Sequence, residues 1–153
     1  MKTAILLLGH GSPRKEANDS LERTAAVVKM VGGYDIVMAA FMEFGKPDIQ
    51  TGASLCVKSG AEKIIFMPYF LYMGAHVSKD LPREMEEAKK KYPNVEMIMA
   101  EPLGEHRKLA EIVIERIGQV GGSQYSALSK KLPPEEIEKE SFRIIDETLK
   151  KYN

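Results

Sequence analysis

Three side chains in this sequence have the chemistry to bind a divalent metal ion and to accept a proton. His10, Glu43 and His76 each come shortly after an apolar run. Neutral imidazole is a good ligand for cobalt, iron and nickel, and its unperturbed pKa of about 6.5 also makes it a base at neutral pH. Two imidazoles and one carboxylate leave coordination positions open, so the set predicts a site that holds a metal ion and can pass it on.

The elements that position these residues follow from the apolar pattern. Four runs are apolar without alternation, which is typical of parallel strands covered on both faces; they span residues 5–8, 36–41, 64–70 and 95–100. Helical apolar spacing follows each run, with the third helix expected at 81–91 and the fourth near 109–118. Ser12 is the expected N-cap of the first helix, and Pro13 and Pro47 are expected in first turns. The pattern predicts an α/β fold with an open, four-stranded, mainly parallel sheet flanked by helices.

In such sheets ligands bind outside the carboxyl ends of the strands. His10 follows the first strand, Glu43 the second and His76 the third, so all three are expected at one rim. A single histidine is more often structural than functional, but two on the same rim favour a functional interpretation. His106 lies in a charged stretch and is expected at the surface.

Composition excludes several classes of partner. Lysine plus arginine and aspartate plus glutamate both total 22, so no net charge favours nucleic acid or an anionic membrane. The first apolar run, residues 4–8, is too short for a signal peptide, and no run approaches the roughly 20 residues of a membrane span. The lone Cys56 is expected to be a buried hydrophobic residue. We expect a cytoplasmic protein that binds neither nucleic acid nor membrane.

The chain is expected to have three parts. Residues 1–120 hold the repeating strands and helices, and Gly121-Gly122-Ser123 opens a linker over 121–133. Residues 134–153 follow paired prolines and carry apolar residues at helical spacing, which predicts a C-terminal helical extension.

Motifs across residues 1–120 resemble the small sirohydrochlorin chelatases of the CbiX and SirB type. The matching segments are Leu7-Leu8-Gly9-His10-Gly11-Ser12 with Ala17-Asn18, Phe41-Met42-Glu43 with Pro47, Pro68-Tyr69-Phe70-Leu71, Gly74-Ala75-His76-Val77 with Asp80-Leu81-Pro82, and Glu101-Pro102-Leu103-Gly104. Each fragment is short, but their combination and order are specific to that family.

The resemblance implies a flavodoxin-like half-lobe that inserts a divalent metal into a sirohydrochlorin-type tetrapyrrole without ATP or an organic cofactor. It implies that His10 and His76 bind the metal, that His10 accepts a proton, and that Glu43 is a third ligand or a proton relay. It also implies a homodimer. The basic residues available for substrate carboxylates are Arg14, Lys15, Lys46, Lys79 and Arg83.

The tail resembles a different family. Leu132-Pro133-Pro134-Glu135-Glu136-Ile137-Glu138 and Ser141-Phe142-Arg143-Ile144-Ile145 are similar to the start of precorrin methylmutases of the CbiC type. That enzyme belongs to cobalamin synthesis, so the resemblance favours Co²⁺ over Fe²⁺ or Ni²⁺ as the inserted metal. A generic docking helix is the alternative interpretation of the tail.

Three other functions use the same residues. The Gly9-to-Ser12 segment opens a helix and suits a phosphate or nucleotide, although no dinucleotide fingerprint or Walker lysine follows. Ser12 with a histidine suits a hydrolase, but no nucleophile elbow is present. A metal carrier that performs no insertion needs the same ligands, and only turnover distinguishes it from a chelatase.

Overall fold

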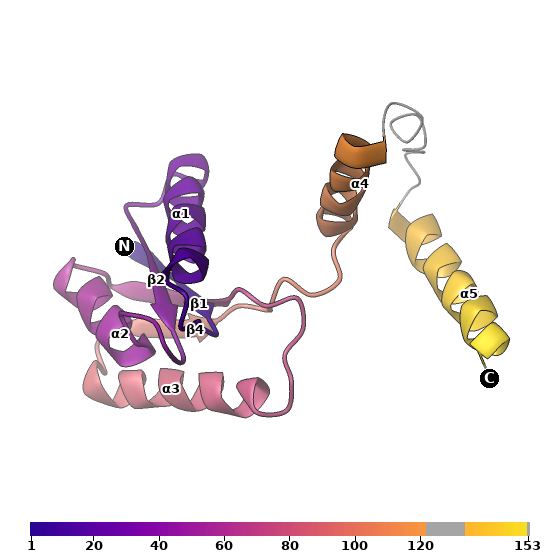
Figure 1. The fold of residues 1–153 in the computed structure, drawn as a ribbon. Coiled ribbons are helices and arrows are strands. Elements are labelled where there is room, and N and C mark those ends of the chain that lie inside the picture. Colours follow the sequence, from indigo (N-terminus) through magenta and orange to yellow (C-terminus); the bar gives the residue numbers. More distant parts are fainter. Residues whose placement is uncertain (122–133, 153) are drawn as a thin grey trace. The chain divides into compact units, whose positions relative to one another are not determined.

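The computed structural model describes residues 1–121 and 134–152. The chain divides into two compact units, residues 1–106 and 107–153. The first unit contains, in order, β1 (Thr3–Gly9), α1 (Lys15–Gly32), β2 (Ile36–Phe41), α2 (Ile49–Lys58), β3 (Lys63–Pro68), α3 (Val77–Lys91) and β4 (Glu96–Met99) (Figure 1). The second unit contains α4 (Arg107–Gly121) and α5 (Pro134–Tyr152).

The four strands form one parallel sheet in the order β2-β1-β3-β4. Leu6 of β1 lies between Met38 of β2 and Phe66 of β3. The predicted parallel α/β fold is therefore confirmed. The third strand ends at Pro68 instead of Phe70, and the bond from the N–H of Tyr69 to the carbonyl of Leu8 at 2.9 Å is the last that joins it to β1.

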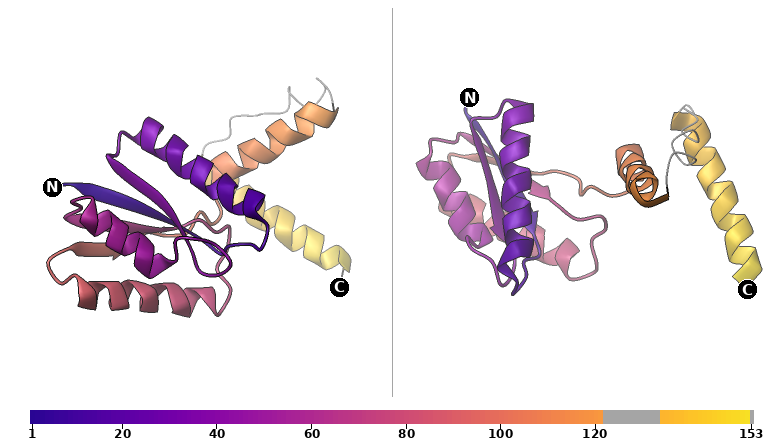
Figure 2. Two further views of the ribbon diagram at one scale, coloured as in Figure 1. Left: turned by 60° about the vertical axis from the view of Figure 1, so that its left-hand side comes forward. Right: turned by 45° about the horizontal axis from the view of Figure 1, so that its top comes forward.

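Helices cover both faces of the sheet. α1 lies on one face, and α2 and α3 lie on the other (Figure 2). Alternate residues of β1 separate between two apolar clusters: Leu6 and Leu8 belong to the cluster that includes α2 and α3, whereas Leu7 packs with residues of α1. Burial of these side chains on both faces explains why the strand has no polar alternation.

Cover is incomplete on the α1 face. β3 alternates between buried and half-buried residues, with Ile65 and Met67 half-buried. Within residues 1–106, α1 packs over β1 and β2 and leaves these two side chains of β3 half-buried.

The helix starts differ from the sequence prediction. α1 begins at Lys15 with Arg14 as its N-cap, so Ser12 is not the cap and Pro13 lies outside the first turn. The Ser12 hydroxyl instead accepts a hydrogen bond from the N–H of Arg14 at 3.1 Å, within the loop. Pro47 precedes the N-cap of α2, and its carbonyl accepts from the N–H of Phe41 at 3.0 Å. Both prolines therefore shape loops that follow strands.

Asp48 caps α2, and its removal is expected to cost about 1 kcal/mol of folding free energy at pH 7. Its carboxylate accepts from the N–H of Thr51 at 2.8 Å, and that bond, with Lys46 and Lys91 nearby, lowers the pKa of Asp48. A lowered pKa means that this stabilisation is present above the pKa of the unfolded aspartate and is lost as the pH falls through the folded value. Urea unfolding of Asp48→Ala from pH 3 to pH 7 should show the difference shrinking toward low pH. Asp48→Asn, which keeps an acceptor, should stay close to the wild type at pH 7.

Cys56 is fully buried, as the sequence predicts, and its burial raises the pKa of the thiol to about 11. Because only the thiolate reacts with alkylating agents, a pKa near 11 instead of 9.0 lowers the reactive fraction about 100-fold at pH 8. Iodoacetamide should therefore label the native chain far more slowly than the chain in urea. Equal labelling rates in the two conditions would show that Cys56 is accessible.

The second unit consists of helices where the sequence predicts them. Apolar side chains of α4 and α5 are exposed, among them Ile112, Val113 and Phe142. Residues 122–133, which make up nearly all of the predicted linker, lie outside the described residues, and the boundary at residue 120 stays a prediction. Across the described part of the chain, no helix combines the length and the hydropathy that crossing a membrane requires.

Candidate functional site

The strand order reverses between β1 and β3. From β1 the chain passes to the neighbouring β2 through α1 on one face of the sheet, and from β3 it passes to β4 on the other side through α3 on the opposite face (Figure 2). Ligands of parallel α/β sheets bind at such switch points. His10 follows β1, Glu43 follows β2, and His76 follows β3, so the three predicted residues leave the sheet on this same edge.

The loops after β1 and β2 are joined by their backbones. The N–H of Met42 donates to the carbonyl of Gly9 at 3.0 Å, and the N–H of Glu43 donates to the carbonyl of His10 at 2.9 Å. These bonds extend the pairing of β1 with β2 beyond the last strand residues. They hold the main chain of His10 beside that of Glu43, whatever their side chains bind.

Gly11 is required by this contact between loops. Its φ is +92°, and a Cβ atom built on it would lie 1.7 Å from the carbonyl oxygen of Glu43. No side chain fits there without separating the two loops. At Gly74, by contrast, no atom beyond the adjacent residues lies within 4 Å of the Cβ position, so the backbone before His76 is open on that side.

The His10 side chain is exposed and weakly held. Its Nδ1 lies 3.4 Å from the carbonyl oxygen of Gly11. His10 borders a hollow beside α1 that is also lined by Asn18, Thr24 and Tyr69. An exposed imidazole with one long contact is available as a ligand or as a proton acceptor.

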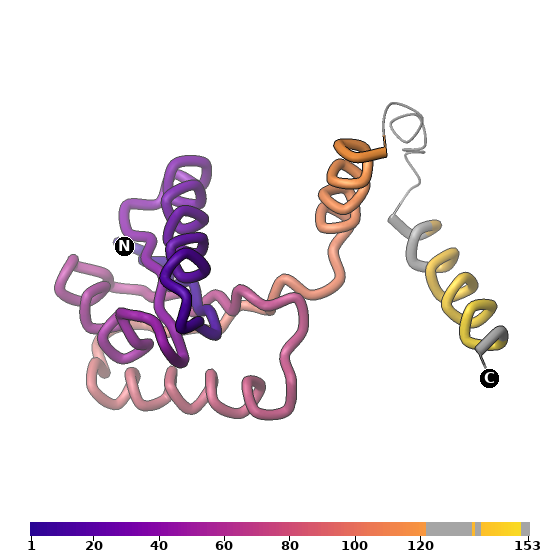
Figure 3. The backbone as a smooth tube through the Cα atoms, in the orientation of Figure 1, coloured from indigo at the N-terminus to yellow at the C-terminus, as the bar shows by residue number. Residues whose placement is uncertain are grey.

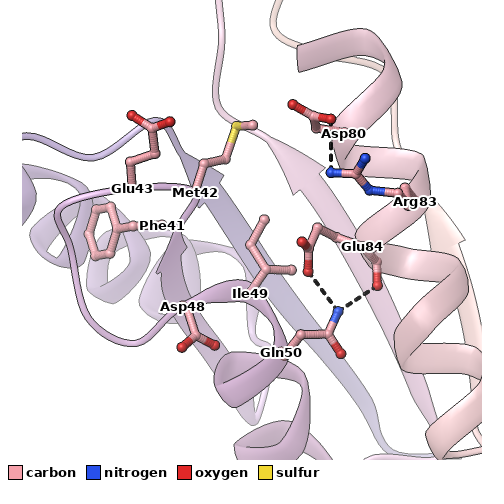
Figure 4. A pocket seen from close by; sticks show the side chains of 9 residues that line it. All are labelled: Phe41, Met42, Glu43, Asp48, Ile49, Gln50, Asp80, Arg83 and Glu84. Atoms are coloured by element: carbon pink, nitrogen blue, oxygen red, sulfur yellow. Dashed lines mark hydrogen bonds and ion pairs between the residues drawn. The ribbon is translucent and has the colours of Figure 1, made fainter. Parts of the chain in front are cut away.

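Glu43 borders a second hollow, which we call the acidic hollow. It is lined by Phe41, Met42, Glu43, Asp48, Ile49, Gln50, Asp80, Arg83 and Glu84. Figure 4 shows Met42 and Glu43 on the β2–α2 loop and Asp80 and Arg83 facing them from α3. Arg83 pairs with Asp80 at 3.1 Å, and Gln50 donates to the Glu84 carboxylate at 2.7 Å. Carboxylates thus outnumber cations in this hollow.

His76 lies at the N-cap of α3, where the sequence places it before a helix. Its carbonyl accepts from the N–H of Asp80 at 2.9 Å, whereas its side chain makes no capping hydrogen bond. The segment from Tyr69 to His76 carries no helix or strand and runs as a loop from β3 to α3 (Figure 3). The exposed imidazole therefore belongs to a loop with few backbone bonds.

The structure pairs the backbones of two of the three residues, whose side chains border different hollows. His10 and Glu43 lie on paired loops, whereas His76 lies on a separate loop at the same edge. Among residues 1–121 and 134–152, no group of three or more histidine, cysteine, aspartate or glutamate side chains is arranged to hold a metal ion. Binding of one ion by all three residues stays a prediction.

In the sequence, Asp80 stands out only as part of a family motif, and Glu84, the second acid of α3 at the hollow, is not singled out. Asp80 and Glu84 lie four residues apart on one helix face and reach the acidic hollow. This spacing was the available signal, but their place opposite Glu43 depends on how α3 packs.

Of the basic residues predicted for substrate carboxylates, Arg83 lines the acidic hollow. Lys15 pairs with Asp19 at 2.8 Å, and Lys46 pairs with Asp48 at 3.8 Å.

The start of α1 is poorly suited to a phosphate group. The N–H of Ser12 donates to Asn18 Oδ1 at 2.9 Å, and the N–H of Arg14 donates to Ser12 Oγ. Two of the amides that an anion could use at this loop are therefore already paired. The Ser12 hydroxyl is engaged with the backbone, which also disfavours a serine hydrolase.

Comparisons with known proteins agree with this geometry. The CbiX family model matches residues 4–120. The chain is 37% identical over 113 residues to the chloroplastic sirohydrochlorin ferrochelatase of Arabidopsis thaliana, covering 74% of this chain and 50% of that protein. It is 30% identical to a sirohydrochlorin cobaltochelatase of Methanopyrus kandleri, covering 79% of this chain and 99% of that protein.

A solved structure of SirB from Bacillus subtilis with Fe³⁺ shares the fold. It matches with a TM-score of 0.73 and 32% sequence identity, covering 80% of this chain and 49% of that one. The chain thus spans about half the length of the Arabidopsis and Bacillus proteins and nearly all of the Methanopyrus protein. The family match covers the sheet, its helices and all three rim residues, and the chain belongs to the CbiX family.

Proposed function

We propose that this chain inserts a divalent metal ion into sirohydrochlorin without ATP. The observation that carries the proposal is the pairing of the His10 and Glu43 loops at the carboxyl edge of the sheet, in a chain of this family. The Arabidopsis protein, of which this chain covers 50%, and the Methanopyrus protein, of which it covers 99%, are both named sirohydrochlorin chelatases, which supports the same substrate here.

Insertion replaces two pyrrole N–H protons of the macrocycle with one M²⁺ ion. His10 and His76 first bind the incoming ion through neutral imidazole nitrogens. As the ion passes to the macrocycle, the freed His10 nitrogen accepts one pyrrole proton. The second pyrrole proton passes to solvent water, directly where Glu43 is a third ligand or through Glu43 where it is a proton relay.

Three protein ligands leave coordination positions of the ion open for the macrocycle nitrogens. All three side chains are exposed, so the macrocycle can reach them. The open backbone at Gly74 leaves room for a flat substrate.

Cobalt is the proposed physiological metal. Two imidazoles and a carboxylate suit Co²⁺, Fe²⁺ and Ni²⁺ alike, and the names of the relatives include both iron and cobalt. The resemblance of the tail to precorrin methylmutases supports cobalt. No organic cofactor takes part in the proposed reaction.

We also propose a homodimer that works in the cytoplasm. The chain spans half of the Arabidopsis relative and 49% of the Bacillus structure, so two copies would supply as much chain as one of those proteins. The balanced charge and the lone cysteine, which fits a reducing compartment, support a cytoplasmic location. Light scattering coupled to size-exclusion chromatography tests the dimer; a monomer at micromolar concentration would contradict it.

The reaction is tested by anaerobic absorbance of sirohydrochlorin mixed with Co²⁺, Fe²⁺ or Ni²⁺, with and without the full chain. We expect insertion faster than the spontaneous rate with each metal that serves as a substrate, and fastest with Co²⁺. A folded chain that binds Co²⁺ but does not accelerate insertion would be a metal carrier and would contradict the proposal.

A further inference from the structure

Asn18 connects the two loops that carry His10 and Glu43. Its side chain lies in the first turns of α1 and is half-buried. Its Oδ1 accepts from the N–H of Ser12 at 2.9 Å, and its Nδ2 donates to the carbonyl of Ser12 at 2.9 Å. The same Nδ2 donates to the carbonyl of Phe44 at 3.4 Å, which is a longer and weaker bond.

These bonds close a ring around the site. The N–H of Glu43 donates to the carbonyl of His10, and Asn18 joins Ser12, two residues after His10, to Phe44, one residue after Glu43. The two loops are therefore tied on both sides of the proposed catalytic residues. Neither loop can shift along the rim without breaking a bond to Asn18 or the bond between the two loops.

Phe44 provides a second, independent observation. Its φ is 52°, a left-handed conformation that costs of order 1 kcal/mol or more for a residue with a side chain. Its side chain is 68% exposed, so packing does not hold this conformation. The hydrogen bond from Asn18 to its carbonyl is a contact that favours it. Backbone strain of this kind persists where the surrounding structure fixes it, and it clusters at functional sites.

We infer that Asn18 is a positioning residue for metal insertion, which sets the place of His10 relative to Glu43 by binding both loops. The inference rests on the proposed function for its effect on rate, but not for its effect on the loops. Displacing a reacting group by about 1 Å can lower a rate about 100-fold. We call the three hydrogen bonds of the Asn18 side chain the Asn18 clamp. Its loss should therefore reduce kcat more than it weakens binding of the tetrapyrrole.

Two substitutions separate the bonds. Asn18→Ala removes all three, whereas Asn18→Asp keeps the acceptor for the Ser12 N–H and places an oxygen against the carbonyls of Ser12 and Phe44. Asp19→Ala is the matched control, because Asp19 is the next residue of the same helix and pairs with Lys15 instead of the loops. We expect kcat to fall about 10-fold to 100-fold in both Asn18 variants. KM for sirohydrochlorin should stay near that of the wild type, and Asp19→Ala should keep full activity.

Amide hydrogen exchange, followed by NMR on the full chain, reports the Asn18 clamp without any turnover. The N–H of Glu43 should exchange faster in both Asn18 variants, because residue 18 no longer donates to the Phe44 carbonyl and the two loops lose that connection. The N–H of Ser12 should exchange faster only in Asn18→Ala. Unchanged exchange at Glu43 in both variants would overturn the inference, as would wild-type kcat in an active enzyme. A wild type that performs no insertion would refute the proposed function, while the exchange rates would still decide the role of Asn18.

Discussion

His10→Ala is expected to lower kcat for metal insertion by about 100-fold or more, toward the spontaneous rate. The substitution removes a metal ligand and the proposed proton acceptor together. Because the imidazole is exposed and makes one contact of 3.4 Å with the backbone, the free energy of unfolding should change by less than about 0.5 kcal/mol. Anaerobic absorbance gives the rate, and urea unfolding gives the stability.

His76→Ala should lower kcat by a similar factor, because it removes the other proposed imidazole ligand. Its free energy of unfolding should also change little, since the exposed side chain makes no capping hydrogen bond at α3. His106→Ala is the control, because His106 follows β4 and lies in none of the motif segments that match the chelatase family, whereas His10 and His76 each lie in one. Insertion that persists at half the wild-type rate or more in folded His10→Ala would remove His10 from the mechanism. An equal loss of insertion activity in His106→Ala would show that removal of any histidine has this effect, and that His10 and His76 have no special role.

Gly11→Ala is expected to destabilise the chain by roughly 2 to 5 kcal/mol and to abolish insertion. A left-handed alanine and forced overpacking each cost about 1 to 3 kcal/mol. Here the new methyl carbon would lie 1.7 Å from the Glu43 carbonyl oxygen, which is backbone. Either the fold loses stability or the two loops separate and carry His10 away from Glu43. Urea unfolding and insertion kinetics measure the two effects.

Gly33→Ala isolates the backbone term. Gly33 also has a positive φ, +68°, but no atom lies within 4 Å of its Cβ position. The free energy of unfolding of Gly33→Ala should fall by about 1 kcal/mol, and its insertion activity should stay at the wild-type level. If Gly11→Ala were no less stable and no less active than Gly33→Ala, the close contact between the two loops would not matter for this protein.

The fold was largely predictable because the parallel strands are short, apolar and separated by helices. Each of the four predicted strands and the order of elements are confirmed. The helix starts were less predictable. Ser12 and Pro13 are typical of a helix N-terminus, but their backbone groups are used in the loop, and the helix begins two residues after Pro13. Local sequence preferences therefore indicate that a helix starts near Ser12 and Pro13, but they do not show that these two residues belong to the loop before it.

The site was predictable at the level of which residues reach the rim. Strand exits alone place His10, Glu43 and His76 on one edge. The pairing between loops was not predictable, because it depends on the register of β1 against β2 and on the left-handed conformation of Phe44. Asn18 appeared in the sequence as part of a motif, and only the fold of the loops shows what it contacts.

X-ray absorption of the Co²⁺-loaded full chain tests most directly whether residues from three strand exits share one metal ion. The account predicts two imidazole ligands in the wild type, one in His10→Ala and in His76→Ala, and two in His106→Ala. Two imidazoles retained in both rim variants, or Co²⁺ bound without imidazole, would contradict the proposed metal site.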